Sequence, residues 1–251
     1  MSANVLLVGE SWVSTSTHIK GFDFFSSSLY ATGGDFLISA LERHGIQVKH
    51  LPGHEAAKDF PFDLEKLQPF RAVILSDVGA NTLLLPPVTF LEGKRVPNRL
   101  ELIKNYVLQG GGLVMAGGYL SFQGIYGAAR YHKSPIEDVL PVALLPVDDR
   151  MEKPEGVNPK VIDNAHFITE GIDAEWPYVL GFNEVTVKQG GELLVKVQEY
   201  PLLVTGSFGK GRSVAWTSDV GPHWCPREFV EWPGYGEVWA RIIQWVSQAN
   251  G

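Results

Sequence analysis

The chain has 251 residues, of which 45% are hydrophobic and 20% are charged. These are ordinary values for a globular protein that is long enough to bury a sizeable core. The formal net charge of -7 argues against a nucleic-acid-binding protein, because such proteins carry a basic surface. The single cysteine, Cys225, excludes an intramolecular disulfide and agrees with a reducing compartment.

The beginning of the chain has no feature of a secretory signal. Met1 leads directly into an apolar run, without the basic segment and the long apolar stretch that a signal peptide needs. No apolar run approaches the ~18 residues of a membrane span. We therefore expect a cytoplasmic protein that does not bind membranes.

The first half of the chain alternates between predicted strands and predicted helices. Short continuous apolar runs are typical of strands that are buried on both faces. The helices are predicted over residues 36–44, after a Thr32-to-Asp35 pattern that resembles a capping box and before Gly45, and over residues 99–109, after Asn98. This β-loop-α order predicts a parallel sheet with right-handed crossovers. The predicted strands are residues 4–9, 47–51, 71–76 and 113–116.

A segment rich in Ser, Phe and Gly, residues 15–30, interrupts this order. We interpret it as a long loop. Its aromatic part, residues 21–30, suits a lid or an oligomer contact, although burial of its phenylalanines in a core or an interface is the plainer expectation.

The second half has a different pattern, in which short strands dominate. A short helix is predicted at residues 134–137, and a closing helix over residues 235–250. Residues 189–191 and 208–211 have the glycine-rich composition of hairpin turns. We expect one domain over residues 1–251, with these hairpins as an antiparallel extension of the sheet. The predicted strands are residues 144–147, 185–188, 193–197, 202–207 and 213–218.

The most informative segment is glycine-rich and follows the strand at 113–116. Small residues around one exposed residue, placed between a buried strand and the next element, are typical of a nucleophile elbow. The run from Gly117 through Gly118 to Gln123 resembles the Gly-x-Cys-x-Gly-x-Gln pattern of the class I glutamine amidotransferases. The resemblance places Tyr119 at the cysteine and Ser121 at the second glycine. A glycine-rich connector without a chemical role would have a similar composition.

The departure from that pattern bears on activity. Glutaminase chemistry in that superfamily needs a thiolate that a histidine activates. A phenol with a reference pKa of about 10 is a poor substitute at neutral pH. We therefore expect that Tyr119 does not support glutaminase activity of the ordinary kind.

A second resemblance lies near the C-terminus. The Gly-Lys-Gly-Arg turn at residues 209–212 and the Thr-Ser-Asp that ends at Asp219 are similar to uncharacterised amidotransferase-like and trehalose-utilisation-like proteins, as is the segment at residues 165–172. In the glutaminases this strand leads into the catalytic His-x-Glu. Here the histidine is missing as well, and His223 follows at a different spacing.

Together these segments identify the chain as similar to the glutamine amidotransferase-like (GATase1-like) family of unknown function, from about Val5 to Trp245. The resemblance implies an α/β fold with a flavodoxin-like, doubly wound, mostly parallel sheet and an antiparallel C-terminal extension. It also implies that the Cys–His pair of the glutaminases is absent from this chain.

Polar residues that follow the predicted strands are the candidates for a site, because ligands of open α/β sheets bind beyond the carboxyl ends of the strands. Acidic and hydroxyl residues there also serve as helix caps or turn formers. Backbone N–H groups of Gly118 and Tyr119 would suit an anionic or carbonyl oxygen. The candidate ligand-binding residues are Glu10, Ser11, Asp77, Gly117, Gly118, Ser121 and Gln123, with Asp219, His223 and Tyr119 as the candidate catalytic residues.

Other candidate functional residues have weaker support from the sequence. Cys225 lies near His223, but a reactive thiol needs an environment that stabilises the thiolate, and we expect an inert cysteine. His50 and His54 are separated by Leu-Pro-Gly, which prevents ligation from one helix face, and further zinc ligands are missing. We expect neither a metal nor a cofactor.

Three functions remain open from the sequence. The first is a degenerate amidotransferase-like protein that binds a small polar ligand or a partner in the old cleft. The second is a hydrolase or lyase of altered chemistry, in which Asp219 and His223 perform acid–base steps. The third is a structural or assembly role, in which aromatic loops form a homo-oligomer around a vestigial site.

Overall fold

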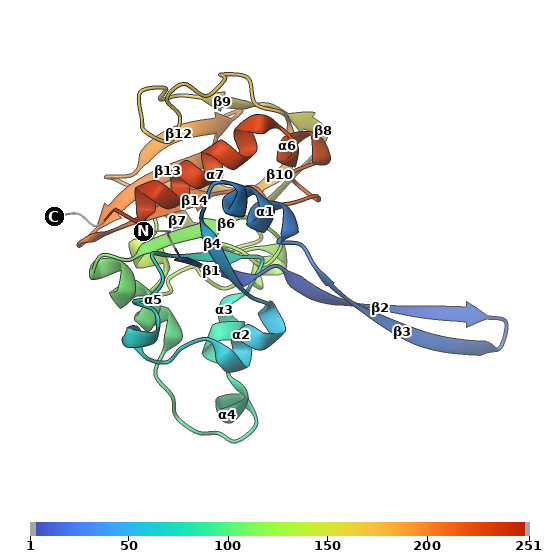
Figure 1. Cartoon of the computed structure of the whole chain (residues 1–251). Helices are drawn as coiled ribbons and strands as arrows, with labels where there is room; N and C mark the ends of the chain where they lie inside the picture. The colour runs from blue at the N-terminus through green and yellow to red at the C-terminus, as the bar shows by residue number, and fades with distance from the viewer. Residues whose placement is uncertain (1–3, 249–251) are drawn as a thin grey trace.

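The computed structural model describes residues 4–248, and an eight-stranded sheet runs through its centre (Figure 1). Neighbouring strands are parallel from β4 to β14 and antiparallel from β14 to β9. The strands, in their order across the sheet, are β4 (Gln47–Leu51), β1 (Asn4–Gly9), β5 (Ala72–Ser76), β6 (Gly112–Ala116), β14 (Gly211–Trp216), β13 (Tyr200–Phe208), β12 (Glu192–Val197) and β9 (Pro159–Val161).

The five parallel strands have the flavodoxin-like order. Numbered among themselves along the chain, they follow the order 2-1-3-4-5 across the sheet. The chain order reverses beside β1, where Leu7 pairs with His50 on one side and with Ile74 on the other. The predicted α/β fold with a mostly parallel sheet and antiparallel C-terminal strands is therefore confirmed.

Helices cover both faces of the sheet (Figure 1). Successive residues of β1 show why both faces need cover: Val5 and Leu7 belong to one buried cluster, and Leu6 and Val8 to the other. One face carries α1 (Asp35–Arg43), α6 (Arg227–Val230) and α7 (Pro233–Val246), and the other carries α2 (Gly53–Asp59), α3 (Ala80–Leu84) and α5 (Arg99–Leu108). The short helix α4 (Pro87–Phe90) lies farther from the sheet, beyond α2 and α3, and has no buried residue.

The predicted helix starts differ in outcome. The Asn98 side chain caps α5 by accepting hydrogen bonds from the amides of Leu100 and Glu101, as the sequence predicts. Helix α1 is also present, but its N-cap is Gly34 and no side chain caps it, so the predicted capping box is wrong. Residues 249 and 250 of the predicted closing helix lie outside the described residues.

The second half holds more strands than the sequence predicts. Two small antiparallel pairs stand beside the main sheet: β8 (Arg150–Val157) with β10 (Val179–Asn183), and β7 (Val142–Leu144) with β11 (Val185–Val187). The strand predicted at 144–147 therefore ends at its first residue. Residues 189–191 connect β11 to a different sheet and do not close a hairpin, whereas the turn after Phe208 does.

The short helix predicted at residues 134–137 is reduced to one 3-10 turn, η3 (Glu137–Val139). The Glu137 carboxylate accepts hydrogen bonds from the backbone amides of Lys133 and Leu144. It thereby binds the segments on both sides of the turn.

The largest correction concerns residues 15–30. They belong to a two-stranded hairpin, β2 (Ser11–Lys20) and β3 (Asp23–Thr32), that projects far from the body of the molecule (Figure 1). The Ser-rich composition hides the alternation of β-branched and aromatic residues that favours strands. Gly21 stands at the first central position of the two-residue turn with a φ of 67°, where hairpins favour glycine. We refer to residues 11–32 as the arm.

Among the described residues, no helix has both the length and the apolar character that crossing a bilayer requires. The longest helix, α7, spans 14 residues, and one side of it is buried against the sheet.

Candidate functional site

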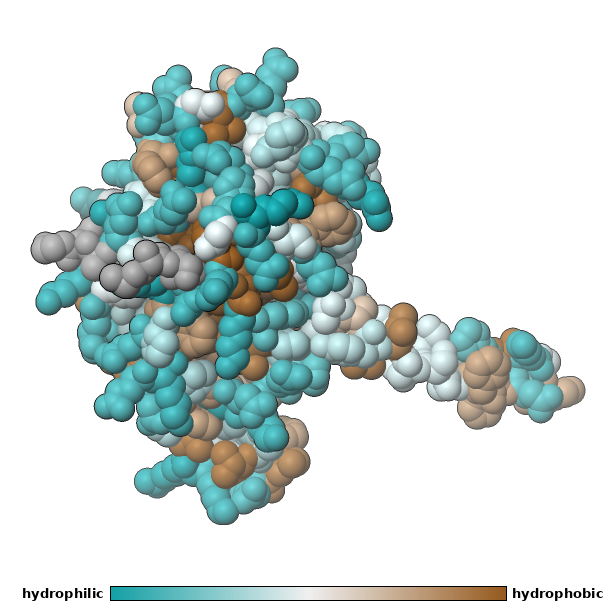
Figure 2. Space-filling view, viewed as in Figure 1, coloured by the Kyte–Doolittle hydropathy of each residue, from teal (hydrophilic) through white to brown (hydrophobic). Residues whose placement is uncertain are grey.

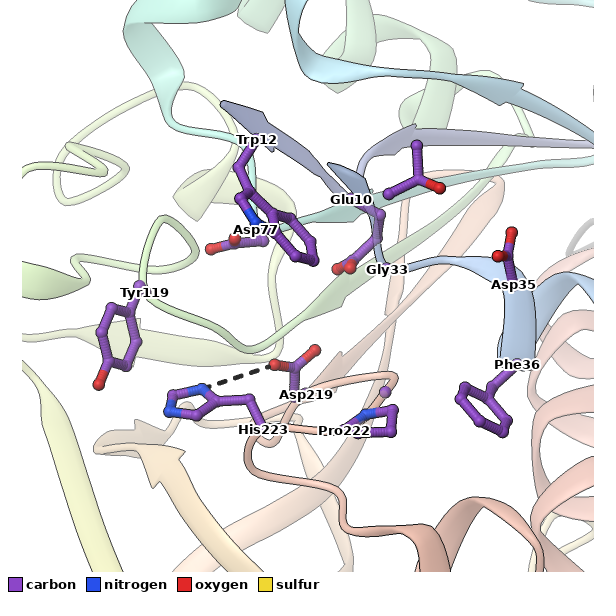
Figure 3. A pocket seen from close by; sticks show the side chains of 12 residues that line it. Glu10, Trp12, Gly33, Asp35, Phe36, Asp77, Tyr119, Asp219, Pro222 and His223 are labelled. Carbon is purple, nitrogen blue, oxygen red and sulfur yellow. Dashed lines mark ion pairs between the residues drawn. The ribbon is translucent and has the colours of Figure 1, made fainter. Parts of the chain in front are cut away.

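A pocket of about 390 Å³ opens at the carboxyl ends of the central strands (Figure 3). Glu10 follows β1, Asp77 follows β5, Tyr119 follows β6 and Asp219 follows β14, so the topology brings together residues from four parts of the chain. The lining residues are Glu10, Trp12, Thr32, Gly33, Asp35, Phe36, Asp77, Tyr119, Asp219, Gly221, Pro222 and His223.

Two of the carboxylates stand on left-handed backbone. Glu10 has a φ of 49° and Asp77 a φ of 44°, a conformation that aspartate adopts more readily than most residues and glutamate rarely adopts. Gly9 permits the first of these turns, because a Cβ there would lie 1.8 Å from the carbonyl oxygen of Ser76. Strain of this kind is typical of functional sites, where the surrounding structure holds it in place.

Glu10 is the most enclosed acid of the pocket, with 4% of its surface exposed. The Ser76 hydroxyl donates a hydrogen bond of 2.5 Å to its Oε1. Burial raises the pKa of the Glu10 carboxyl well above its ordinary value, and the charges of Asp219 and Asp77 raise it further. Glu10 therefore favours the protonated form more strongly than an exposed glutamate does.

Asp219 lies beyond the end of β14, on a turn that Trp216 holds by donating its Nε1–H to the Asp219 carbonyl oxygen at 3.0 Å. The amide of Val220 donates to Asp219 Oδ1 at 2.7 Å. Burial, together with the charge of Asp77, raises the pKa of the carboxyl to about 7. Asp219 therefore exchanges its proton near neutral pH.

Asp77 binds the loop that follows β6. Its Oδ1 accepts the Leu120 amide at 2.7 Å, and its own amide donates to Ser121 Oγ at 3.0 Å. Burial raises the Asp77 pKa, while the hydrogen bonds from the Leu120 and Tyr119 amides and the charge of His223 lower it. The carboxylate thus occupies the amides that could otherwise receive an anion.

This arrangement corrects the expectation of an oxyanion site at Gly118 and Tyr119. The Gly118 amide donates to Asn183 Oδ1 at 3.0 Å, and the Tyr119 amide interacts with Asp77. The Gly118 donor is therefore satisfied within the chain, and the Tyr119 amide is directed to a carboxylate that disfavours an anionic oxygen beside it. A Cβ on Gly118 would lie 3.1 Å from Asp77 Oδ1, so the close approach of this loop depends on glycine.

Tyr119 lines the pocket, but its setting is not a nucleophile elbow. The segment after β6 consists of turns, and no helix follows until the 3-10 turn η2 (Ile125–Gly127). The Tyr119 hydroxyl donates to Glu152 Oε1 at 3.0 Å, and the Arg150 guanidinium lies 4.8 Å from the ring centre. Burial and Glu152 raise the pKa of the phenol. Tyr119 is therefore a neutral wall of the pocket at physiological pH.

His223 joins this wall to Asp219. Its ring meets that of Tyr119 edge-on, with 4.8 Å between the ring centres, and stacks on Trp224 at 5.7 Å. His223 Nδ1 lies 4.0 Å from Asp219 Oδ2, which Figure 3 marks as an ion pair. The two side chains are therefore close to, but beyond, hydrogen-bonding distance.

The remaining candidates do not line the pocket. Ser11 Oγ accepts the amide of Gly53 at 2.7 Å, and Gly117 packs against the backbone at Thr217, with 2.1 Å between that carbonyl oxygen and an added Cβ. Ser121 Oγ binds the Asp77 amide. Gln123 Oε1 accepts the amide of His132 at 3.2 Å. These four residues hold the loops that shape the pocket, and a role in ligand contact has no geometric support.

Several lining residues escaped the sequence analysis. Trp12 and Thr32 belong to the base of the arm, next to the segment 15–30 that the sequence analysis interpreted as a loop. Asp35 and Phe36 belong to the first turn of α1. The signal that could have found them is their position in the first β-to-α connection, which always borders the carboxyl edge of a parallel sheet.

The other titratable candidates lie outside the pocket. Cys225 is fully buried, with its Sγ 3.7 Å from Ser218 Oγ, and burial raises the thiol pKa well above its ordinary value. His50 Nε2 lies 2.9 Å from the Gly9 carbonyl oxygen, and His54 lies 3.8 Å from Glu55. Over residues 4–248, no group of three His, Cys, Asp or Glu side chains has an arrangement suited to a metal ion.

The flavodoxin-like sheet and the position of the pocket define an α/β protein of the class I glutamine amidotransferase-like type. Residues 4–248 match the family model described as "Putative glutamine amidotransferase", and the chain belongs to that family. The family resemblance expected from the segments around Tyr119 and Asp219 is thus confirmed.

Two solved structures from Salmonella typhimurium resemble the chain over nearly its whole length. Cytoplasmic protein STM3548 is 38% identical with a TM-score of 0.94, and the match covers 98% of this chain and 99% of that one. Cytoplasmic protein STM1381, from strain LT2, is 40% identical with a TM-score of 0.93, over 97% and 99% of the two chains. No curated protein matches the chain at a significant level.

A more distant structure shows the fold alone. A "Putative thua-like protein" from Parabacteroides merdae is 14% identical with a TM-score of 0.61, over 100% of this chain and 92% of that one.

Proposed function

We propose that this protein binds a small polar ligand in the pocket above the sheet and that it has no glutaminase activity of the ordinary kind. The observation that carries the proposal is the pocket itself, in which three carboxyl groups from separate strands, Glu10, Asp77 and Asp219, lie behind an aromatic rim. A concave site with a few convergent polar groups of perturbed pKa is typical of ligand binding.

The polar groups of the pocket indicate the chemistry of the ligand. Among the lining residues that the structure describes there is no lysine or arginine, and four are acidic. The loop amides nearest the pocket already bind Asn183 and Asp77. The site therefore offers acceptors, and it favours a ligand that donates hydrogen bonds through hydroxyl or ammonium groups and disfavours a carboxylate or a phosphate.

The rim supports the same ligand class. Trp12, Phe36 and Tyr119 present aromatic surface to the pocket. Aromatic rings interact favourably with cations over their faces and pack well against apolar edges of polyhydroxy compounds. Carboxylates below and rings around them suit an amine, an amino sugar or a sugar.

The environment of the only cysteine argues against glutaminase chemistry. Cys225 is buried, and its pKa is raised well above the ordinary value, so a thiolate is disfavoured. Tyr119 stands at the position where the amidotransferase pattern has its nucleophile, and its phenol is held neutral by Glu152. As a cytoplasmic location is stated for both Salmonella relatives, we propose the same location here.

Thermal-shift measurements with defined compounds test this function. Amines, sugars and carboxylates would be added separately, and a ligand present at 100 times its dissociation constant stabilises the folded state by about 2.7 kcal/mol. We expect stabilisation by members of the first two groups and none by carboxylates. Stabilisation by carboxylates alone would contradict the proposed chemistry.

Substitutions localise the binding. Trp12→Ala removes part of the rim, and Asp77→Asn removes one charge while it keeps an oxygen that can accept the Leu120 amide. Both variants should lose at least about tenfold in affinity, which corresponds to about 1.4 kcal/mol. Glu65→Gln is the matched control, because Glu65 is exposed and does not line the pocket. Unchanged affinity in both pocket variants would show that the ligand binds outside the pocket.

Acid–base catalysis is the second candidate function. The pKa of Asp219 near 7 and its approach to His223 within 4.0 Å favour it, since a catalytic acid is most effective when its pKa lies near the working pH. A hydrolase or lyase of this kind would lose its turnover in both Asp219→Asn and His223→Gln, and retain ligand binding in at least one of them. Hydrolysis and elimination assays on the ligands from the thermal-shift screen separate this function from binding alone.

A further inference from the structure

The arm is the most exposed structural element of the molecule. Its two ten-residue strands pair in continuous antiparallel register, from Ser11 opposite Thr32 to Lys20 opposite Asp23. A strand of this length extends about 34 Å. All residues from 12 to 30 are exposed, and the strands pair with each other and with no other described strand (Figure 1).

Such a hairpin needs a partner for its stability. An isolated two-stranded hairpin is marginally stable in water, and its outer edges present unpaired backbone N–H and C=O groups. Natural proteins protect free edges with charged side chains. The only Asp, Glu, Lys or Arg residues of the arm are Lys20 and Asp23 at its tip, so its long edges carry no such protection.

The side chains of the arm are arranged in three zones (Figure 2). The middle zone is a ladder of small hydroxyl side chains, in which Thr15 lies 3.1 Å from Ser28 and Thr17 lies 3.2 Å from Ser26. Large apolar side chains stand at both ends and are 45% to 107% exposed. The base cluster consists of Trp12, Val13, Leu29 and Tyr30, and the tip cluster of Ile19, Phe22, Phe24 and Phe25.

The base of the arm is held by the body of the molecule, whereas the rest is not. Ser11 accepts the amide of Gly53, and the Tyr30 ring meets the His54 ring edge-on at 4.8 Å. Because the base is fixed, the arm presents its tip at a defined distance and direction. A fixed projection with an apolar end is suited to a specific contact.

We propose that two copies of this chain form a dimer through their arms, which lie antiparallel so that the tip cluster of each copy packs on the base cluster of the other. This arrangement follows from the three zones. A two-fold axis between two equivalent free edges, level with the hydroxyl ladder, places small side chains beside small side chains and brings both pairs of apolar clusters together. It also pairs one free edge of each hairpin.

The size of the arm agrees with this partner. A standard interface takes about 20 to 30 residues from each side, and the arm supplies its two ten-residue strands and the turn between them. Since Trp12 and Thr32 also line the pocket, the tip of the second copy lies beside the pocket mouth. The dimer thus becomes part of the surroundings of the ligand site, although the proposal does not depend on ligand binding.

Light scattering coupled to size-exclusion chromatography tests the dimer. The native chain should have twice the mass of one chain, and a variant in which residues 13–30 are replaced by a short Gly-Ser turn should have the mass of one. Phe24→Asp should weaken the dimer at least tenfold through its tip cluster. Leu91→Asp is the matched control, because Leu91 is an equally exposed apolar residue, at 76%, outside the arm, and it should leave the mass unchanged.

Two results would overturn the proposal. One is a native chain that stays monomeric at about 100 μM, a concentration far above the dissociation constants of standard interfaces; a membrane or another protein would then be the partner of the arm. The other is an oligomer whose mass does not change when the arm is removed. Neither result bears on the pocket, because the thermal-shift screen reports on it independently.

Cross-linking tests the antiparallel arrangement itself. Because Cys225 is buried, introduced cysteines report cleanly on their own positions. A mixture of Phe22→Cys and Val13→Cys chains should form a disulfide-linked heterodimer under mild oxidation, and Phe22→Cys alone should form at most one tenth as much homodimer. Preferential Phe22-to-Phe22 cross-linking would show a tip-to-tip contact and contradict the tip-on-base arrangement.

Discussion

The pocket floor and the arm are neighbours in the sequence and opposites in environment. Glu10 is a buried acid, while residues 12–30, which begin two positions later, are exposed and contain only two charged side chains. The pocket holds acidic side chains that are largely buried, and the arm holds apolar side chains that are exposed to water. Both arrangements are unfavourable for the isolated chain.

The comparison shows how one β-to-α connection can carry two different interactions. Glu10 and Gly33, at the two ends of the arm, are joined by a backbone hydrogen bond of 3.0 Å from the Gly33 amide to the Glu10 carbonyl oxygen. This bond holds the two ends of the arm together beside the pocket, which both residues line. A contact made at the tip is therefore anchored beside the pocket.

The largest expected effect is that of Gly9→Ala. The added Cβ would lie 1.8 Å from the Ser76 carbonyl oxygen at a φ of 109°, so strands β1 and β5 would have to separate. We expect a loss of more than about 4 kcal/mol in the free energy of unfolding, measured by urea denaturation. Gly21→Ala at the tip, where no atom lies within 4 Å, should strain only the arm, by about 1–2 kcal/mol. An equal loss in the free energy of unfolding for Gly9→Ala and Gly21→Ala would contradict this difference between the pocket and the arm.

The next effect is the pH dependence of Asp219→Asn. The raised pKa of about 7 means that the folded state binds a proton more tightly than the unfolded state. The stability that this proton confers is present below about pH 4 and is lost as the pH rises through about 7. Asparagine removes the buried charge and still accepts the Val220 amide, so the variant should exceed the native protein by about 2–4 kcal/mol at pH 8 and by little at pH 4.

Thermal unfolding from pH 4 to pH 8 measures this difference. Asp35→Asn is the matched control, because Asp35 lies at the rim of the same pocket but is exposed. It should show no comparable gain at pH 8. A parallel pH dependence of the native protein and Asp219→Asn would show that Asp219 is not the titrating group.

A smaller effect is expected from Tyr119→Phe. The substitution removes the hydrogen bond from the phenol to Glu152, while Trp224 Nε1 still donates to the other Glu152 oxygen at 3.0 Å. We expect a loss of about 0.5–1.5 kcal/mol in urea denaturation. Tyr126→Phe, at a tyrosine that is 84% exposed, should change stability by less than about 0.5 kcal/mol. A larger loss at Tyr126 would refute the role given to Glu152.

The smallest effect should come from Phe24→Ser in the arm. Phe24 is 74% exposed, so its loss should change the free energy of unfolding of the monomer by less than about 0.5 kcal/mol, at a concentration where light scattering shows single chains. The same change at Phe60, which is 1% exposed, should remove about 3–5 kcal/mol. A large loss at Phe24 would mean that the arm packs on the body of its own chain.

The parallel half of the fold was predictable because its strands are short continuous apolar runs separated by clear punctuation. Each of β1, β4, β5 and β6 was located to within one residue, since burial on both faces leaves a strong local signal. Strand β8 was missed because it is partly exposed and mixed in composition, and β10 because it is a five-residue segment that contains glycine and asparagine. Their pairing is long-range, and no local pattern reports it.

The site was predictable in position but not in chemistry. Residues after strands predicted Glu10, Asp77, Tyr119, Asp219 and His223, and all five line the pocket. The expectation of a free amide was wrong for Gly118, which donates to Asn183, and the Tyr119 amide interacts with Asp77. That the five pocket-lining residues contact a ligand stays a prediction.

The sequence by itself determined the positions of the parallel strands and the edge of the sheet at which the acids gather, because both depend on local hydrophobic patterns and on the direction of parallel strands. Only the tertiary structure decided that Asp77 accepts a hydrogen bond from the Leu120 amide, that the pKa of Asp219 is raised to about 7, and that residues 11–32 project from the body as an arm. These properties depend on burial and on partners distant in the chain, which a local pattern does not contain.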